Sequence, residues 1–337
     1  MGIEQMAAWL REHDDFLVVS HAHPDGDALG ATLAAAHLLK ALGKRAVMYN
    51  ATGLPEAYDW LELPVPFVSG LAQLDGLGFK PAACLALDCG DLARTGDELA
   101  KAWQAGAFAT TASIDHHRDN PLFAEVNWVE VRASATAQLV GELARFFDFE
   151  LSGALGEAVY LGIATDTGNF QYDNTSAEIL DMAADIVRRG LAVGEFNEHL
   201  NQWTLPRLKA WVELMSLMNT AFDGRLVYVA AEQEFFDRHN LPGTDYSDFS
   251  SLLRRIKGTR IGLFIRATGP GKSKASLRSS GLVDVCKAAQ ALGGGGHRNA
   301  AGVEMAVSPR EALALLLPHL EQVLAENAGG GLSGGGG

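Results

Sequence analysis

Short, almost continuous apolar runs alternate with helical patterns through the first half of the chain. Strands of a parallel sheet are buried on both faces, so they lack the alternation of polar and apolar residues that half-exposed strands show. Runs separated by helical segments are typical of such a sheet. The pattern therefore predicts an α/β fold with a parallel sheet and flanking helices. The expected strands are FLVVS at 16–20, RAVMY at 45–49, CLALD at 84–88 and TTASID at 110–115.

The pattern changes twice further along the chain. Residues 134–218 read mainly as helices, and strand-like runs such as RLVYVA, IGLFIRAT and KASLRS follow, which indicates a second, smaller α/β domain. The final AGGGLSGGGG cannot bury a core, which predicts disorder. The expected divisions are a first domain over 1–203, a connecting helix over 204–218, a second domain over 219–327 and a disordered glycine-rich tail over 328–337.

Composition limits the ligands and the compartment. The 337 residues carry a formal net charge of −14, which speaks against binding long duplex nucleic acid, because that requires many cations to neutralise phosphates. Three cysteines without CxxC spacing suit a reducing compartment. No stretch reaches the ~18 apolar residues of a membrane span, and the first ten residues lack a signal-peptide pattern. We expect a cytoplasmic protein that binds no membrane.

Histidine and aspartate residues gather where the apolar runs end. Ligands of parallel sheets collect beyond the carboxyl ends of the strands, and imidazole with carboxylate is a usual donor set for divalent metals. The ensemble predicts a site for two divalent ions. Each aspartate taken alone also suits a turn or a helix cap. The residues concerned are His21, Asp25 and Asp27 in HAHPDGD, Asp88 in LALDCGD, Asp115, His116 and His117 in DHH, and Asp166 in ATDTGNF.

These motifs, in this order, resemble the four motifs of the DHH phosphoesterase family. GGGGHRNAAG at 293–302 resembles the DHH-associated C-terminal domain of the same family, so the resemblance covers residues from about 16 to 305. The combination is most similar to the nanoRNase and phosphoadenosine-phosphate phosphatase branch. Two positions depart from the family pattern: His23 stands where Asn is more frequent, and Ala31 where Ser is frequent. The role of His23 is left open.

The resemblance implies a role for each of these residues. His117 would face the scissile phosphate, and Asp115 would orient His116 through its second ring nitrogen. Mixed imidazole and carboxylate ligands favour Mn²⁺ over Mg²⁺, so we expect two manganese ions. The implied ligands are His21, Asp25 and Asp88 for one ion, and Asp27, Asp88, His116 and Asp166 for the other, with Asp88 as the bridge.

Substrate contacts are expected mainly in the second domain. Consecutive glycines can direct backbone N–H groups at an anion, and Arg suits paired phosphate contacts. A flexible linker, a solvated strand face and a surface helix remain open as alternatives for these segments. GPGKS at 269–273 lacks the spacing of a P-loop and predicts a hairpin turn. The candidates are Arg94, Lys274, Arg278, Ser279, Gly294, Gly295, Gly296, His297 and Arg298.

The resemblance implies a hydrolase whose active cleft lies between a catalytic first domain and a substrate-binding second domain. Its expected substrates are very short single-stranded RNA, cleaved to mononucleotides, and 3′-phosphoadenosine 5′-phosphate, converted to AMP. A cyclic or linear dinucleotide phosphodiesterase is the alternative, followed by a regulatory nucleotide-binding protein. A homodimer is left open.

Overall fold

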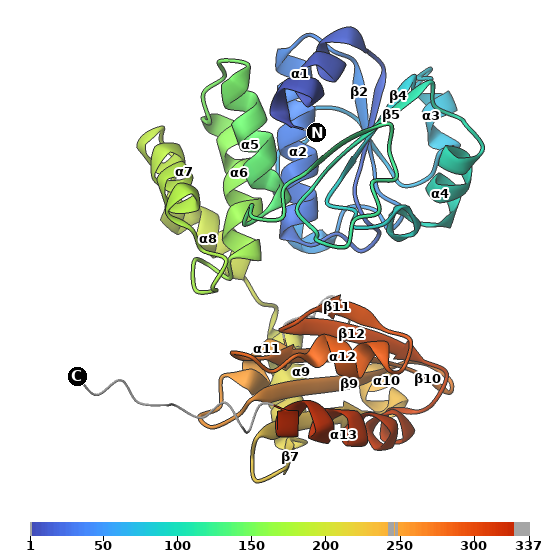
Figure 1. Cartoon of the computed structure of the whole chain (residues 1–337), viewed down its shortest axis with the longest axis vertical. Helices are drawn as coiled ribbons and strands as arrows, with labels where there is room; N and C mark the ends of the chain where they lie inside the picture. Colours follow the sequence, from blue (N-terminus) through green and yellow to red (C-terminus); the bar gives the residue numbers. More distant parts are fainter. Residues whose placement is uncertain (1, 242–245, 247–248, 327–337) are drawn as a thin grey trace. The chain divides into compact units, whose positions relative to one another are not determined.

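The computed structural model describes residues 2–241, 246 and 249–326 (Figure 1). It divides into two compact units, Met1–Gln202 and Trp203–Gly337, and each contains its own sheet with helices. The predicted α/β class is therefore confirmed. The tail expected at 328–337 lies outside the described residues.

A six-stranded sheet in which every pair of neighbours is parallel forms the centre of the first unit. Its order is β3-β2-β1-β4-β5-β6. The four expected runs are all strands, whereas β3 and β6 were not predicted, because one has two residues and the other contains a polar Asn. The strands are β1 Phe16–Val19, β2 Ala46–Tyr49, β3 Phe67–Val68, β4 Ala83–Leu87, β5 Thr110–Asp115 and β6 Val126–Val129.

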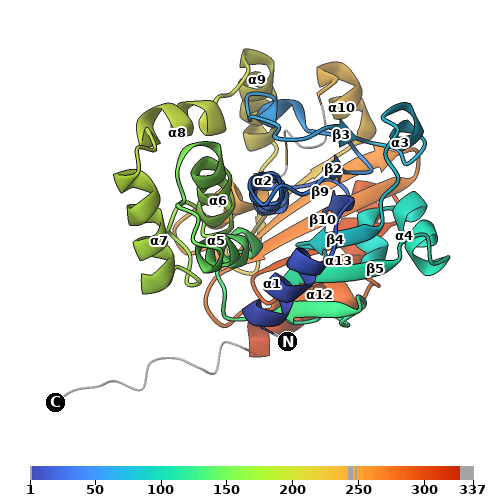
Figure 2. The same cartoon turned by 90° about the horizontal axis from the view of Figure 1, so that it is seen from above.

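Helices cover both faces of this sheet (Figure 2). Phe16 and Val18 of β1 pack into the core formed with α1, α2, α5 and α6, while Leu17 and Val19 pack on the other side with Leu74 of α3 and other apolar residues. Burial on both faces explains the continuous apolar runs. The helices are α1 Ile3–Glu12, α2 Gly26–Ala41, α3 Gln73–Gly76, α4 Asp97–Gln104, α5 Thr136–Phe146, α6 Gly153–Asp166, α7 Ala177–Arg188 and α8 Val193–Asn201, with 3₁₀ turns η1 Glu56–Tyr58 and η2 Leu92–Thr95.

The strand order reverses between β1 and β4. From β1 the chain proceeds outward through β2 and β3, and from β4 it proceeds outward in the opposite direction through β5 and β6. The segments that follow β1 and β4 therefore leave the same edge of the sheet at neighbouring positions and diverge, which leaves room for a ligand there. His21 and Asp88 follow these two strands.

Helices α2 and α6 pack with their backbones in close contact. A Cβ atom at Gly30 would lie 2.6 Å from the carbonyl oxygen of Ala158, and one at Gly162 would lie 2.6 Å from Oδ1 of Asp27. Both positions therefore require glycine. This packing brings the first turn of α2, which carries Asp27, beside the last turn of α6, which ends at Asp166.

The second unit contains a mixed sheet in the order β11-β12-β10-β9-β8-β7, in which only the β8–β9 pair is parallel among the described strands. The hairpin turn expected at 269–273 joins β9 to β10. The elements are α9 Leu205–Ser216, β7 Asn219–Ala221, β8 Leu226–Ala231, α10 Gln233–His239, α11 Phe249–Arg254, β9 Ile261–Gly269, β10 Lys272–Ser279, α12 Val285–Gln290, β11 Gly295–His297, β12 Ala300–Met305 and α13 Pro309–Glu326.

Two cores lie on opposite faces of the second sheet. Leu263 and Ile265 of β9 pack with α12 and α13, whereas Phe264 packs with α9, α10 and α11. Helix α9 contributes Ala210 and Trp211 to the latter core, so it belongs to the second unit.

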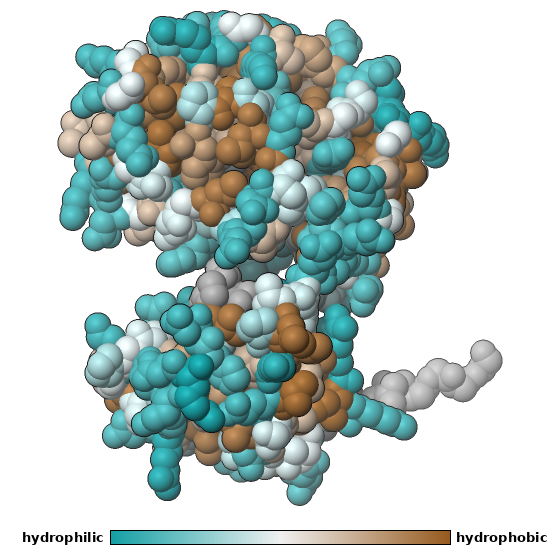
Figure 3. Space-filling view, turned by 180° about the vertical axis from the view of Figure 1, so that it is seen from behind, coloured by the Kyte–Doolittle hydropathy of each residue, from teal (hydrophilic) through white to brown (hydrophobic). Residues whose placement is uncertain are grey.

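Hydrophilic side chains are widespread on the face of both units drawn in Figure 3, with apolar areas between them. Among the described residues, no helix combines the length and the apolar character needed to cross a membrane.

Candidate metal centre

The loop between β1 and α2, together with the first turn of α2, presents the first three predicted ligands. Asp25 is the N-cap of α2, and its Oδ1 accepts hydrogen bonds from the backbone N–H groups of Asp27 (3.1 Å) and Ala28 (3.0 Å). The capping interpretation of Asp25 is thus correct, but it leaves the same oxygen 3.8 Å from His21 Nε2. Capping and metal binding are compatible here.

A buried amide holds this loop in place. The Nδ2 of Asn50, at the end of β2, donates to Ser20 Oγ (3.1 Å) and to the carbonyl oxygen of His21 (2.8 Å). The Oδ1 of Asn50 accepts from Thr52, whose hydroxyl accepts from the backbone N–H of His23 (2.8 Å). His23 itself is exposed and has a left-handed backbone with φ of 55°. Asn50 was not predicted from the sequence.

His21 forms one candidate ligand group with two carboxylates. Its Nε2 lies 3.8 Å from Asp25 Oδ1 and 3.7 Å from Asp88 Oδ2. This nitrogen is buried and has no hydrogen-bond partner among the described residues, while Nδ1 contacts the carbonyl oxygen of Ala22 (2.9 Å). A buried, unpaired imidazole nitrogen facing two carboxylate oxygens suits a cation between them.

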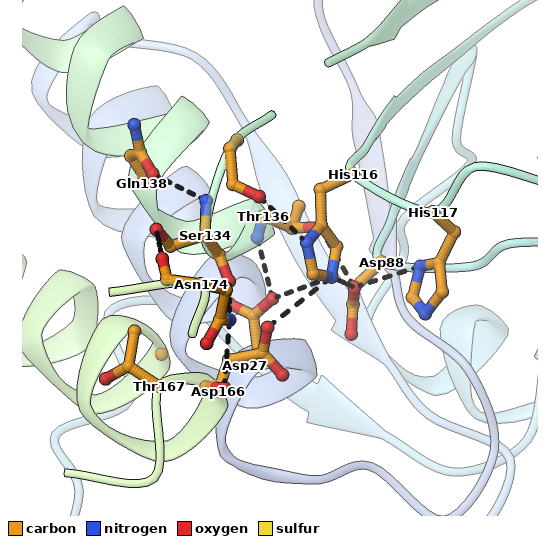
Figure 4. A network of polar contacts seen from close by, with 12 residues as sticks. Asp27, Asp88, His116, His117, Ser134, Thr136, Gln138, Asp166, Thr167 and Asn174 are labelled. Atoms are coloured by element: carbon orange, nitrogen blue, oxygen red, sulfur yellow. Dashed lines mark hydrogen bonds and ion pairs between the residues drawn. The ribbon is translucent and has the colours of Figure 1, made fainter. Parts of the chain in front are cut away.

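His116 forms a second group, shown in Figure 4. Its Nε2 lies 3.6 Å from Asp88 Oδ1, 3.7 Å from Asp166 Oδ2 and 3.9 Å from Asp27 Oδ2. Asp88 therefore directs one oxygen to each group, from a left-handed backbone with φ of 57°. The six predicted metal ligands, drawn from segments as distant as residues 21 and 166, lie together.

Two carboxylates of the second group, Asp27 and Asp166, resist ionisation in the absence of a cation. Burial raises the pKa of Asp27 well above its ordinary value, and Asp88 and Asp166 raise it further. Burial, with Asp88 and Asp25, also raises the pKa of Asp166 to about 7, against the opposing effect of His116. A bound divalent cation would remove this repulsion.

The separations also fit metal coordination. At 3.6–3.9 Å, these nitrogens and oxygens are too far apart for hydrogen bonds. Two ligand atoms that each lie ~2.1 Å from one ion would be about 3.0–3.4 Å apart, only a few tenths of an ångström closer. The residues present thus suit metal binding, and Asp88 faces both ligand groups.

Asp115 contacts a different histidine from the one we expected. Its Oδ1 lies 2.7 Å from His117 Nδ1, whereas His116 Nδ1 faces the carbonyl oxygen of Ala133 at 3.3 Å. The prediction that Asp115 orients the ring of His116 is wrong, because β5 ends at Asp115 and the next two side chains diverge. The hydrogen bond between the two residues is the one that the backbone N–H of His116 donates to Asp115 Oδ1 (2.9 Å).

This pair shifts both pKa values. Burial lowers the pKa of His117, but the hydrogen bond with Asp115 and the charge of Asp88 outweigh it and raise the value. Burial raises the pKa of Asp115, yet its bonds with His117 and Asn120 hold the value below the ordinary one. His117 therefore retains its proton more readily than a free imidazole does.

The N-terminus of α5 contacts two of the aspartates and was not recognised in the sequence. The backbone N–H groups of Thr136 and Ala137 donate to the two oxygens of Asp27 (2.7 and 2.9 Å), and the Thr136 hydroxyl donates to Asp88 Oδ1 (2.9 Å). Backbone donors leave no mark in a sequence, so only the hydroxyl offered a signal.

Arg94 of η2 lies beside His117. A Cβ atom built at Gly90, between them, would be 3.1 Å from Arg94 Nη1 and 3.4 Å from His117 Cγ. The Arg94 residue is exposed, so its guanidinium can reach a ligand.

The substrate candidates of the second unit separate into two sets. Arg278 of β10 and His297 of β11 are both register partners of Ala300 in β12, which lies between them. Lys274 lies on the same face of β10 as Arg278, and its Nζ is 3.4 Å from Glu304 Oε1. Arg298 follows β11 and is exposed, as are Gly296 and His297, while Gly295 is half-buried.

Two candidates differ from the expectation. The Ser279 hydroxyl is buried, donates to the carbonyl oxygen of Val283 (2.6 Å) and accepts from Asn299 (2.9 Å), so it serves the fold. The Gly294 N–H donates to the carbonyl oxygen of Ala289 (2.9 Å) rather than facing an anion. The second half of the glycine run, Gly295 and Gly296, opens the edge strand β11, and Gly294 and Gly296 lie too close to β12 to carry a Cβ atom, so the run is not a flexible linker.

Known proteins share both units. A model of the DHH family N-terminal domain matches residues 15–163, and a model of the DHHA1 domain matches residues 224–336. The chain is 31% identical over 289 residues to the bifunctional oligoribonuclease and PAP phosphatase NrnA of Thermus thermophilus, an alignment that covers 86% of this chain and 83% of that protein. The protein of the same name from Mycoplasma genitalium is 27% identical over 294 residues, covering 87% and 89%.

A solved structure extends the likeness to the fold. The crystal structure of an exopolyphosphatase-related protein from Bacteroides fragilis, 25% identical, covers 95% of each chain with a TM-score of 0.85. The family matches, the identity to full-length relatives and the grouping of His and Asp side chains lead to one conclusion: the chain belongs to the DHH family of phosphoesterases and carries its DHHA1 domain.

Proposed function

We propose that this protein is a phosphoesterase that hydrolyses very short RNA to mononucleotides and also removes the 3′-phosphate of 3′-phosphoadenosine 5′-phosphate. The observation that carries the proposal is Asp88, whose two oxygens face two separate groups of imidazole and carboxylate ligands. A shared carboxylate is what two-metal phosphoester hydrolysis requires. Relatives named as bifunctional oligoribonuclease and PAP phosphatase support the choice of substrates.

His21, Asp25 and Asp88 would hold one ion, and Asp27, Asp88, His116 and Asp166 the other. Mixed nitrogen and oxygen donors favour Mn²⁺ for both. When bound, the ions would supply Lewis-acid chemistry, which neutralises phosphoryl oxygens and activates water for attack. No covalent bond between the enzyme and the substrate is needed.

In this proposal the chain's own residues donate the proton that the departing oxygen takes up and orient the phosphate. Asp115 fixes the His117 ring through Nδ1 and favours its protonated form. We propose that His117 addresses the scissile phosphate and gives its proton to the departing oxygen. Arg94, beside His117, would hold a phosphoryl oxygen.

Substrate capture falls to the second unit in this proposal. Lys274, Arg278, His297 and Arg298, with the backbone of Gly295 and Gly296, would bind the phosphate that is not cleaved. With a net charge of −14 the protein offers no long cationic track, so dinucleotides to roughly pentanucleotides should be preferred over long strands. Cys84, Cys89 and Cys286 are buried and form no disulfide among the described residues, which suits the cytoplasm, where we place the activity.

A substrate panel tests the proposal. Demetallated protein is supplied with Mn²⁺ or Mg²⁺ and incubated with a dinucleotide, a pentanucleotide, a long single strand, 3′-phosphoadenosine 5′-phosphate, a cyclic dinucleotide and pyrophosphate at one salt concentration. We expect turnover of the short RNAs and of 3′-phosphoadenosine 5′-phosphate, highest with Mn²⁺. Preferential turnover of the cyclic dinucleotide, or equal efficiency on the long strand, would refute the substrate assignment.

A further inference from the structure

The Thr136 hydroxyl contacts Asp88 at the point where the two ligand groups meet. We propose that Thr136 is a positioning residue whose hydroxyl fixes the orientation of the Asp88 carboxylate, so that one oxygen serves each metal. The inference rests on the metal-ligand assignment of the proposed function. It adds a residue that binds neither metal nor substrate but determines whether the second ion is held.

The contact is short and fully enclosed. Thr136 Oγ1 donates to Asp88 Oδ1 at 2.9 Å, and the exposed fractions of Thr136 and Asp88 are 0% and 2%. The accepting oxygen is the one that faces His116, at 3.6 Å, while Oδ2 faces His21 at 3.7 Å. Rotation of this carboxylate would move Oδ1 away from His116, and the hydroxyl opposes that rotation, so its loss should weaken mainly the ion site at His116.

The hydroxyl and the backbone of Thr136 have separable tasks. The backbone N–H donates to Asp27 Oδ2 (2.7 Å) and is kept by any substitution other than proline. The hydroxyl alone reaches Asp88, so its removal should affect the orientation of Asp88 and leave the bond to Asp27 in place. This distinction makes the inference testable without removing a ligand.

The helix end that carries Thr136 is anchored to the other side of the site (Figure 4). The Ser134 N–H donates to Gln138 Oε1 (2.8 Å). The Asn174 amide donates to the carbonyl oxygens of both Ser134 and Asp166 (3.1 Å each). Thr136 is thus held in register with the end of α6, where Asp166 lies.

Two other buried threonines bond the backbone of their own helices. Thr32 of α2 and Thr167 after α6 do so, since their hydroxyls donate to the carbonyl oxygens four residues earlier, Ala28 and Ile163, at 2.6 Å each. Thr136 differs, because it occupies the first residue of α5 and its hydroxyl bonds a carboxylate from another strand end. Thr32, which is 2% exposed, is therefore a matched control.

Metal binding to the full-length, demetallated protein tests the inference. Thr136→Val removes the hydroxyl and keeps the branched shape, Thr136→Ser keeps the hydroxyl, and Thr32→Val removes a buried hydroxyl elsewhere. Calorimetric titration with Mn²⁺, with free ion measured by electron paramagnetic resonance, gives the number of sites and each Kd. We expect Thr136→Val to weaken one of two sites by about 10- to 100-fold, as loss of an orienting partner usually does. Thr136→Ser should restore most of this affinity, and Thr32→Val should bind as the parent protein does.

Each other outcome decides against the inference. Two sites of parental affinity in Thr136→Val, or an equal loss in Thr136→Ser, would show that the hydroxyl does not position Asp88. An equal loss in Thr32→Val would trace the effect to general destabilisation. If Thr136→Val does not fold, Thr136→Ala serves as the second variant without a hydroxyl and is judged by the same criteria. A parent protein that binds no Mn²⁺ would instead overturn the metal assignment, and with it the proposed function.

Discussion

The candidate metal centre of the first unit and the polar face of β10 and β12 in the second unit are built in opposite ways. Asp27 and Asp88 are each 2% exposed and are fixed by donors from α5. Lys274 and Arg278 are half-buried, and His297 is exposed on an edge strand. Buried, oriented groups suit a reacting centre, whereas cationic side chains that are only partly buried suit capture of a charged ligand. This difference supports the proposed division, in which the first region performs the chemistry and the second binds the substrate.

Asp88→Asn should have the largest effect. It removes the charge that faces both ligand groups, so both metals should be lost. Lewis-acid stabilisation is worth several kcal/mol, and ~1.4 kcal/mol is a factor of ten, so turnover should fall on the order of 1,000-fold. The circular dichroism spectrum should stay unchanged. Retention of two bound ions with normal turnover would disprove the bridging role.

His116→Ala should follow, with kcat lower by about 100-fold and KM little changed, because it deletes one ligand of one group. Steady-state kinetics on a dinucleotide would measure this. His319→Ala, a change far from the site in sequence and in the second unit, is the control and should match the parent enzyme. A rise in KM alone would assign His116 to binding instead.

Arg278→Ala probes the other region. Loss of a charge-assisted phosphate contact should raise KM about tenfold with kcat maintained. Lys257→Ala, which removes an exposed cation between α11 and β9, distinguishes a specific contact from a general charge effect. If both variants raise KM equally, β10 has no special role and the comparison between the regions fails.

Ser279→Ala should have the smallest effect on catalysis, and it tests whether Ser279 belongs to the substrate-binding face. The change breaks two internal hydrogen bonds, so the free energy of unfolding should fall by about 1 kcal/mol, seen in urea denaturation. KM should stay at the parental value. A raised KM with an unchanged free energy of unfolding would show instead that Ser279 contacts the substrate.

The sequence predicted those parts of the site that depend on strand ends. His21, Asp88 and His116 follow apolar runs that became neighbouring strands, so their meeting could be expected from the α/β pattern. The partner of Asp115 could not, because two adjacent histidines are equivalent until the backbone direction at the end of β5 is known. The position of Asn50 depends on how β2 lies beside β1, which no local pattern encodes.

The inward direction of Ser279 could have been predicted from its place in the expected strand. Neighbouring residues of a strand point to opposite faces, so Lys274 and Arg278 share a face that Ser279 cannot share. The glycine run was predicted as an anion loop because consecutive glycines can direct backbone N–H groups at an anion. Its use as an edge strand depends on the close approach of β12, which only the fold determines.

The glycine contacts between α2 and α6 bear on whether this centre could be transplanted. A designer who copied the six ligands onto another α/β scaffold would reproduce the donor set but not the distance between two helix backbones that Gly30 and Gly162 permit. With alanine at Gly30 the two helices would have to separate, and with alanine at Gly162 the new Cβ atom would meet Ala137 of α5 and the Asp27 carboxylate, so Asp27 would shift without any ligand having been altered. A transfer of the centre would therefore have to include the pair of helices in backbone contact as well as the ligands that they carry.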